Sequence, residues 1–448
     1  MVNSHKSQIM LNSPVLKALI FLSLPTMFGM FSIFFINLVD AYYIGLLGVL
    51  PLAAVSFSLP IIFIMMSFSI GIAIGVAAVV SRFLGSSKLL EAKNSTSNTL
   101  FLKFVTMIFI SIIGISLITP IFHLMGAEGE LLELIHDYML IWFFGTPFFG
   151  VLVISNSAIR SFGDSLTPGL ILFLTSLVNA VLDPILIFGL GPITPLGIKG
   201  AALATVLSYM FGMLLMMIFL KRINLLSLPN LNLNELFLSV KAILFVGLPA
   251  SLTMMLQPLI LIYVVVLVSF HGNDAIAAFG IGSRIESFAM IGIIAIASTQ
   301  TSFIGQNLGA KKYDRVKKGL YYNILFTVCW GILIALPLIL LRDFIAVLFS
   351  ENFLVQQKIK LYILIVGLSY PFFGLSNIAS GAFNGFQMPL HATLIWVIRL
   401  FLITIPLVYI GNIFYGFLGI LVGISLANII SSFYSILWAR FKLFKNLN

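Results

Sequence analysis

Two acidic residues stand alone inside long apolar stretches of this 448-residue chain. Asp40 lies near the end of the first stretch, three residues after Asn37, and Asp183 lies in a later one, four residues after Asn179. Residues three or four apart share a helix face, so each carboxylate is expected to have an amide beside it. A carboxylate inside a membrane-length helix costs roughly 2.5–3.5 kcal/mol on insertion scales, so it is expected to have a partner or a function.

The chemistry that these groups offer is the binding of a cation. Hard cations prefer oxygen ligands, and two neighbouring carboxylates can instead share protons because like charges resist being ionised together. Thr205 adds a hydroxyl at a compatible depth, and the predicted cation-coupling residues are therefore Asp40, Asn179, Asp183, Thr205 and Asn37. Of these, Asp40, Asn179 and Asp183 would be the metal ligands if the ion is Na⁺. The alternative is that these side chains only join neighbouring helices, which is ordinary for amides and hydroxyls in membranes.

Depth along the helices allows the two acids to meet. At about 1.5 Å per residue, Asp40 lies roughly 36 Å along its helix from Leu16. Asp183 lies about 22 Å along a helix that runs outward from Pro168. The two carboxylates are therefore predicted to share a level in the outer half of the membrane, although they are far apart in the chain.

The elements that position them follow from the composition, which is 60% hydrophobic and only 8% charged. A soluble domain is about one quarter charged, and the apolar runs reach or exceed the roughly 20 residues that a membrane crossing needs. The chain is therefore predicted to be an all-α integral membrane protein. Twelve spans are expected, at 15–44, 52–83, 95–121, 134–160, 168–190, 199–221, 240–270, 275–305, 320–349, 359–384, 388–411 and 416–440.

The distribution of charge predicts the orientation. Most of the 24 lysines and arginines fall in loops and span ends on one side, among them Lys103 near the start of the third expected span. The positive-inside rule then places both termini in the cytoplasm and the protein in the inner (cytoplasmic) membrane. This also accounts for the net charge of +10 without a nucleic-acid partner. No cleavable signal peptide is expected, because the first apolar run is too long, and the single cysteine, Cys329, rules out a disulfide within the chain.

The chain is an internal duplication. A shift of 224 residues places Leu24-Pro25 on Leu248-Pro249, Gly85 on Gly309 and Tyr138 on Tyr362. The register then slips slightly, so that Gly197 and Gly200 match Gly416 and Gly419. Six spans per repeat is an even number, so the halves should be related by an axis along the membrane normal, as in parallel-repeat transporters.

This organisation predicts two pseudo-symmetric six-helix lobes around a central cleft. The N-terminal lobe (residues 1–221) would carry the cation site, a cytoplasmic linker would span 222–239, and the C-terminal lobe would span 240–448. Because neither Asp40 nor Asp183 has an acidic counterpart in the second repeat, the coupling chemistry is expected in the N-terminal lobe alone.

Other polar or bending positions within spans give weaker expectations. Arg284 and Glu286 are two residues apart and do not face each other, so each either contacts substrate in the cleft or pairs with another helix. Pro25 and Pro249 occupy matching helices and are possible bending points, because proline is a common cause of helix kinks. Aromatic and methionine residues are abundant enough to line an adaptable cleft, but most of them would face lipid or the core.

The sequence resembles the multidrug and toxic compound extrusion (MATE) family over nearly its whole length. The motifs that carry the resemblance are Pro25 with Asn37-Leu38-Val39-Asp40, the stretch from Gly71 to Ser81-Arg82-Phe83-Leu84-Gly85, Asn179-Ala180-Val181-Leu182-Asp183-Pro184, Gly197-Ile198-Lys199-Gly200-Ala201-Ala202 and Gln306-Asn307-Leu308-Gly309-Ala310.

The resemblance implies a V-shaped pair of lobes that exports organic, often cationic, compounds in exchange for H⁺ or Na⁺. The cation site of prokaryotic members carries over onto Asp40, Asn179 and Asp183, and Asn156 matches a cleft position. Some relatives have acidic residues in the seventh and tenth helices, and this sequence has none there. That departure favours the branch resembling the DNA-damage-inducible (DinF-like) transporters and argues against an ion site in the C-terminal lobe.

The leading hypothesis is a secondary antiporter that exports small cationic or lipophilic compounds and needs no cofactor beyond its coupling ion. It is expected to contact membrane lipids and to be monomeric. The alternative is a flippase for a lipid-linked precursor, which is disfavoured because most basic residues lie in loops rather than in spans. An enzyme is not expected, because the chain has no H-E-x-x-H, G-x-S-x-G or Walker A motif.

Overall fold

The computed structural model describes residues 9–191, 194–229 and 232–444, and nearly all of them are helical. Its helices are α2 (Val15–Leu46), α3 (Val49–Gly85), α4 (Leu89–Leu124), α5 (Gly129–Ser161), α6 (Leu166–Phe188), α7 (Ile198–Arg222), α8 (Leu233–Ser269), α9 (Asn273–Ala289), α10 (Ile291–Gly309), α11 (Tyr313–Leu340), α12 (Arg342–Phe349), α13 (Phe353–Gly367), α14 (Tyr370–Gly385), α15 (Pro389–Val397), the π-helix η1 (Ile398–Thr404) and α16 (Ile405–Phe444).

The described residues form the twelve crossings that the sequence predicts. Nine helical stretches are long and apolar enough to span a membrane, and the bent pairs α9–α10 and α13–α14 bring the number to 11. One of these stretches, Pro389–Leu443, is 55 residues long and counts only once. It folds back on itself at Gly416, whose φ of 58° and ψ of −136° are not helical. Gly411 packs against Gly419 and Gly423 packs against Leu407, which is the register of an antiparallel hairpin and supplies the twelfth crossing.

Several boundaries differ from the sequence-based expectation. The expected ninth span divides into α11 and the short α12. α8 begins at Leu233, within the expected linker, because the Asn232 side chain accepts a hydrogen bond from the Asn234 N–H and caps that helix.

Lys103 was expected among the basic residues of the loops and span ends, but it is only 4% exposed within α4. Its ammonium lies 3.9 Å from the centre of the Phe68 ring, so the long side chain is held inside the lobe by an aromatic face.

The backbone confirms the duplication independently of residue identity. Unusual positive φ angles recur at the same shift of 224 residues, at Gly48 and Gly272 (121° and 86°), Ser87 and Lys311 (60° and 57°), and Gly163 and Gln387 (99° and 59°). After the slip in register, Gly197 and Gly416 match at 56° and 58°. The two repeats therefore turn their chains at corresponding points, with α2–α7 forming the N-lobe and α8–α16 the C-lobe.

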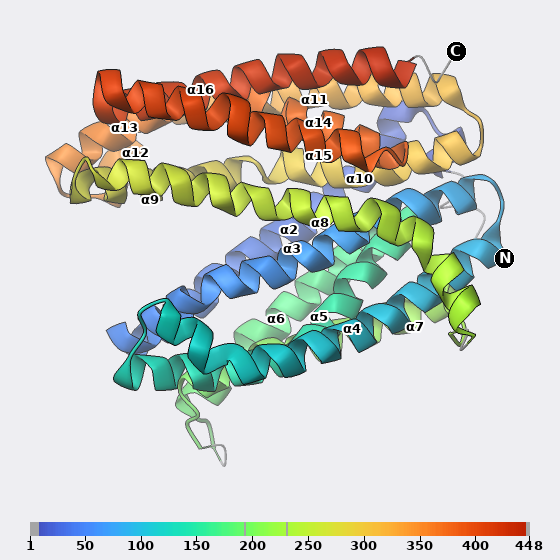
Figure 1. Ribbon diagram of the computed structural model, residues 1–448, viewed down its shortest axis with the longest axis horizontal. Coiled ribbons are helices and arrows are strands. Elements are labelled where there is room, and N and C mark those ends of the chain that lie inside the picture. The colour runs from blue at the N-terminus through green and yellow to red at the C-terminus, as the bar shows by residue number, and fades with distance from the viewer. Residues whose placement is uncertain (1–8, 192–193, 230–231, 445–448) are drawn as a thin grey trace.

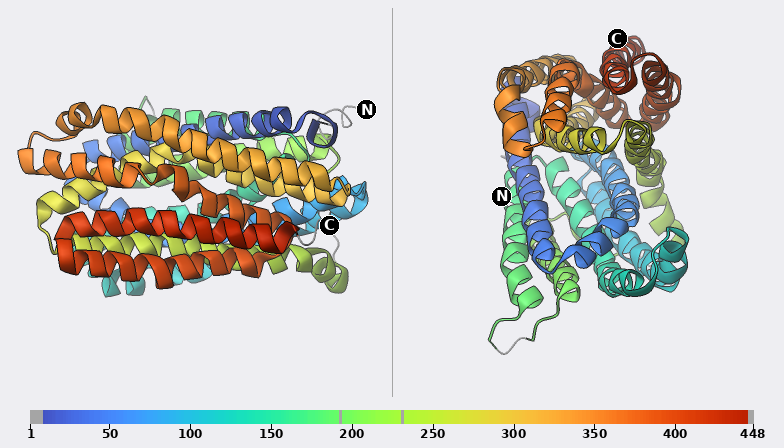
Figure 2. Two further views of the ribbon diagram at one scale, coloured as in Figure 1. Left: turned by 90° about the horizontal axis from the view of Figure 1, so that it is seen from above. Right: turned by 90° about the vertical axis from the view of Figure 1, so that its left-hand side faces the viewer.

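The two lobes meet near the end of the molecule where both termini lie and diverge toward the other end (Figure 1). Figure 2 shows the same two groups of helices end-on. Glycines of α3 allow its backbone to contact the C-lobe, with Gly75 against Gly247 of α8 and Gly85 against Gln306 of α10. Side-chain hydrogen bonds reinforce this contact, between Ser23 Oγ and Thr299 Oγ1 (3.0 Å), from Arg160 Nη1 to Ser298 Oγ (2.9 Å), from Arg82 Nη1 to Gln387 Oε1 (3.0 Å) and from Gln306 Nε2 to the Ser161 carbonyl (2.6 Å).

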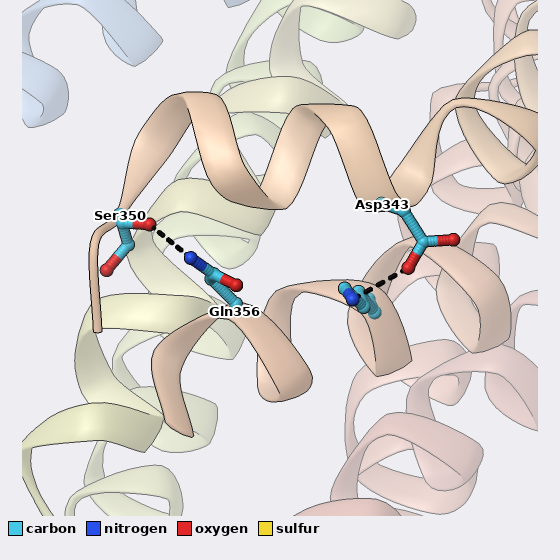
Figure 3. Close-up of polar contacts among 4 residues, drawn as sticks. Asp343, Ser350 and Gln356 are labelled. Atoms are coloured by element: carbon cyan, nitrogen blue, oxygen red, sulfur yellow. Dashed lines mark hydrogen bonds and ion pairs between the residues drawn. The ribbon is translucent and has the colours of Figure 1, made fainter. Parts of the chain in front are cut away.

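At the opposite end, the turn between α12 and α13 is closed by polar contacts (Figure 3). Gln356 Nε2 donates to the Ser350 carbonyl at 2.8 Å, and Lys360 Nζ lies 2.7 Å from Asp343 Oδ1. The hydrogen bond from Lys360 holds the pKa of the exposed Asp343 carboxyl below its ordinary value. These contacts tie α12 to α13 within the C-lobe.

The α16 hairpin gives a test of the fold. A Cβ at Gly411 would overlap the Gly419 backbone, so Gly411→Ala should destabilise the protein by about 1–3 kcal/mol, the usual cost of overpacking. Gly280→Ala is the matched control, because nothing lies within 4 Å of a Cβ there. Thermal unfolding in detergent should show a lower midpoint for Gly411→Ala and an unchanged or higher one for Gly280→Ala. Equal midpoints would contradict the hairpin register.

Candidate cation site

The fifth crossing, α6, holds the more deeply buried half of the predicted site. Asp183 is fully buried and Asn179 is 7% exposed. Four residues of helix separate them, so Asn179 Nδ2 donates to Asp183 Oδ1 at 3.2 Å. The other carboxylate oxygen, Asp183 Oδ2, is buried and makes no hydrogen bond within the described part of the chain.

The first crossing, α2, carries Asp40. Small residues allow the two helices to approach closely, and a Cβ at Gly169 of α6 would lie only 2.6 Å from the Pro25 carbonyl of α2. The carboxyl groups of Asp40 and Asp183 are near enough for their charges to interact. Asp40 Oδ1 is also buried and unpartnered among the described residues. The structure thus places the two acids that the sequence singled out within electrostatic reach of each other.

Two tyrosines that were not among the predicted site residues complete this cluster. Tyr138 of α5 is 4% exposed, and its phenol interacts electrostatically with both Asp40 and Asp183. Tyr209 of α7 interacts with Asp40 in the same way. Tyr138 was noticed only as a position shared with Tyr362 of the second repeat. The hydroxyl of Tyr138 within an apolar run was the sequence signal that could have identified this residue.

The remaining predicted members lie nearby or apart. Thr205 is half-buried on α7, one turn before Tyr209, and its hydroxyl donates to the Ala201 carbonyl at 3.1 Å, which leaves the oxygen able to accept or to bind an ion. Asn37 is exposed on α2, and the structure does not bring its side chain to the two acids. The cluster is therefore built from α2, α5, α6 and α7.

This arrangement suits a singly charged cation or a proton. It offers two carboxylates with one free oxygen each, one amide oxygen and neutral hydroxyls, all set in an apolar lobe. In the described residues, no group of three or more His, Cys, Asp or Glu side chains gathers as for a divalent metal. With Asn179, Asp40 and Asp183 fit the ligand set expected for Na⁺, and the same two carboxylates fit protons equally well.

The expected cleft residues are dispersed. Asn156 is half-buried on α5, one turn before Arg160, whose guanidinium reaches Ser298 of the C-lobe. Arg284 is exposed on α9. Glu286 is half-buried, and Tyr362 donates its hydroxyl to Glu286 Oε2 at 2.6 Å. Arg284 and Glu286 therefore have different surroundings, and Glu286 pairs across helices.

Pro25, expected as a bending point, lies within α2, which runs as one helix from Val15 to Leu46. Its carbonyl lies at the close contact with Gly169 of α6. A change in the shape of α2 at this position would therefore alter the packing of α2 against α6, which carries the second acid.

Comparison with known proteins assigns the chain to a family. The MatE family model matches residues 25–185 and again 249–410, two segments that begin 224 residues apart. An FAD transporter from Shewanella oneidensis is 32% identical over 94% of this chain and 93% of its own length. A probable multidrug resistance protein, YoeA of Bacillus subtilis, is 27% identical over 88% of each chain. A mutant of the MATE transporter VcmN from Vibrio cholerae is 30% identical, superposes with a TM-score of 0.92 and is covered over 98% of its length, against 97% of this chain.

The family model matches both halves of the chain, and relatives that match over nearly their full length are transporters. This multi-pass membrane protein, with two lobes of six crossings each, therefore belongs to the MatE family of transporters and is not an enzyme.

Proposed function

We propose that this transporter is a secondary antiporter that exports organic compounds in exchange for H⁺ or Na⁺ bound between Asp40 and Asp183. The observation that carries the proposal is the pair of unpartnered carboxylate oxygens, Asp40 Oδ1 and Asp183 Oδ2, buried in the same lobe. Buried oxygens of this kind are costly unless an ion or a proton occupies the space between them. Thr205 and Asn179 are proposed as further oxygen ligands, with Asn37 outside the immediate site.

The placement of Asp40 on α2 links the site to the contact between the lobes. Nearer to its beginning, the same helix contacts the C-lobe through the Ser23–Thr299 hydrogen bond and through Phe31, whose ring centre lies 5.2 Å from that of Phe288. Asp40 lies beyond these contacts, toward the end where the lobes diverge. A change of charge at Asp40 therefore acts on the helix that connects the two lobes.

The proposed cycle follows from this linkage. With the positive-inside orientation, the joined end of the lobes faces the cytoplasm and the divergent end faces outward. Binding of a cation neutralises the two carboxylates, and its release restores their repulsion. A ligand can shift the balance between inward- and outward-facing states only by binding one state more tightly, and the site supplies this difference through α2.

The substrate is proposed to be a small organic compound. The relatives are named for multidrug resistance and for FAD transport, so both lipophilic cations and anionic nucleotides are classes to test on this chain. Asn156, Arg284 and Glu286 are proposed to line its route. A monomer in the inner membrane with both termini in the cytoplasm remains our expectation.

The coupling role of the acids predicts a selective loss of transport. Asp40→Asn and Asp183→Asn should each reduce ethidium efflux from cells to the level of cells without the protein. In each variant the neutral amide that replaces the carboxylate can no longer release and rebind a cation. Asp343→Asn removes an exposed carboxylate at the divergent end and should leave efflux unchanged, since a surface ion pair contributes little. Membrane abundance of all three variants is measured by immunoblot. Wild-type efflux by Asp40→Asn would remove this mechanism.

The identity of the ion is tested in proteoliposomes. Efflux of ethidium is followed under a pH gradient alone and under a Na⁺ gradient alone. One of the two should drive transport, and Asp183→Asn should abolish that response. Transport driven by neither gradient would exclude cation antiport and favour the alternative, a flippase, which is then assayed with a fluorescent lipid-linked sugar.

Tyr138 gives a finer test, because its phenol interacts electrostatically with both acids. Tyr138→Phe keeps the ring and its packing, so the protein should fold and transport, but its apparent affinity for the coupling ion should change severalfold. Tyr42→Phe, on the exposed face of α2, is the control and should leave the ion dependence unchanged. An identical ion dependence in all three proteins would show that Tyr138 only packs.

A further inference from the structure

Three crossings of the C-lobe lose their regular helical course around one polar cluster. α9 and α10 bend by 45° at Met290, one turn after Glu286, and α13 and α14 bend by 50° beside Ser369. The eleventh crossing contains the π-helix η1, which includes Arg399. Interrupted helices in transporters often form binding sites, and π-helical turns are frequent at functional positions.

Arg399 is the centre of this cluster. It is 5% exposed, and its guanidinium carbon lies 4.8 Å from the ring centre of Phe373 and 5.0 Å from that of Trp396. Nη2 donates to Asn428 Oδ1 at 2.6 Å, and Asn428 in turn donates to Ser369 Oγ at 2.8 Å. Nη1 is buried and has no acceptor among the described residues. The guanidinium suits paired oxygen acceptors, and one of its two terminal nitrogens therefore has no acceptor.

The nearby acid does not fill this half. Glu286 interacts with the charge of Arg399, but its Oε2 is taken by the Tyr362 hydroxyl at 2.6 Å. The ion pairs Lys199–Asp137 and Lys360–Asp343 join other residues. Arg399 is thus held near a counter-charge but not neutralised by contact with it.

The duplication places this cluster on elements that correspond to those of the cation site. Tyr362 corresponds to Tyr138, and Arg399 lies in the eleventh crossing, the counterpart of the fifth, which holds Asn179 and Asp183. Asn428 corresponds to Tyr209 in the later register. The same position in the two lobes therefore offers carboxylates on one side and a guanidinium on the other.

We propose that Arg399 binds the acidic group of an organic substrate, a carboxylate or a phosphate ester, and that this C-lobe cluster is a substrate subsite. The inference rests on the export function proposed above and adds a chemical class to it. Asn428 and the two aromatic rings orient the guanidinium, and the free Nη1 supplies the second hydrogen bond of a bidentate contact. The coupling ion remains at Asp40 and Asp183, in the other lobe.

Flavin mononucleotide and riboflavin test this inference, because they share a fluorescent ring and differ by one phosphate. Binding is measured by quenching of flavin fluorescence on the full chain in phosphatidylcholine nanodiscs. The wild type should bind flavin mononucleotide about tenfold or more tightly than riboflavin, as expected for a charge-assisted bidentate contact. Arg399→Gln should abolish this preference and leave riboflavin binding unchanged. The control, Arg440→Gln, removes an exposed arginine of the same lobe and should keep the preference.

Arg399→Lys keeps the charge but loses the fork, so it should show an intermediate preference, and it replaces Arg399→Gln if that variant does not fold. Equal affinities of the wild type for the two flavins would overturn the proposal, as would an equal loss of both ligands in the variants. A preference that disappears in nanodiscs of anionic lipid would assign the site to a lipid headgroup and overturn the substrate assignment. Ethidium efflux driven by the ion gradient is measured in the wild type and in the control Arg440→Gln, and both should transport. Efflux in these two proteins together with equal flavin affinities would overturn this inference while leaving cation antiport standing.

Discussion

The proposed chemistry of this protein depends on two carboxylates of one lobe that interact electrostatically and lack enough partners. Asp183 receives one hydrogen bond from Asn179, and one oxygen of each acid remains free. Charges of this kind are costly inside a membrane protein, which is the physical reason for proposing a cation or protons there. The close packing of α2 on α6 at Pro25 and Gly169 maintains the pair, because it leaves the two helices little freedom to separate.

The duplication supplies a symmetric scaffold, and the chemistry departs from that symmetry. Backbone turns such as those at Ser87 and Lys311 are retained in both repeats, since they set the directions of the helices. The side chains between the turns differ in charge. The N-lobe carries Asp40 and Asp183, whereas the C-lobe carries Arg399 beside Glu286. Two lobes of common origin can therefore take on separate tasks while still moving as similar rigid units.

Much of this arrangement could be predicted from the sequence. The lengths of the apolar runs gave the twelve crossings, and the rarity of acids within those runs singled out Asp40 and Asp183. The bends beside Met290 and Ser369 were not predicted, because neither residue is a helix breaker; Gly292, next to the first bend, packs closely on Trp330 of another helix, a contact that the sequence does not show. The burial of Lys103 depends on the Phe68 ring of another helix, and hydropathy does not record such a partner.

Helix periodicity also explains what was missed in the site itself. Asn37 and Asp40 are three residues apart, and this spacing alone favoured a shared environment, yet α2 leaves Asn37 exposed. Tyr138 and Tyr209 reach the acids from α5 and α7, so only the packing of four helices reveals them. Spacing within one helix is visible in a sequence, whereas the face that a helix turns toward its neighbours depends on the whole lobe.

The contact between the lobes is suited to being broken and remade. It includes backbone contacts at glycines, the contact of the Phe31 and Phe288 rings, and hydrogen bonds such as those from Gln306 to Ser161 and from Arg160 to Ser298. The ion pairs Lys199–Asp137 and Lys360–Asp343 each lie within one lobe. Hydrogen bonds contribute about 0.5–1.5 kcal/mol each, so a handful of them amounts to a few kcal/mol. Reversing a two-state population from 1:99 to 99:1 takes about 5.5 kcal/mol. In the antiport proposed above, ion binding at Asp40 and Asp183 supplies this free energy through α2, which also contacts the C-lobe at Ser23.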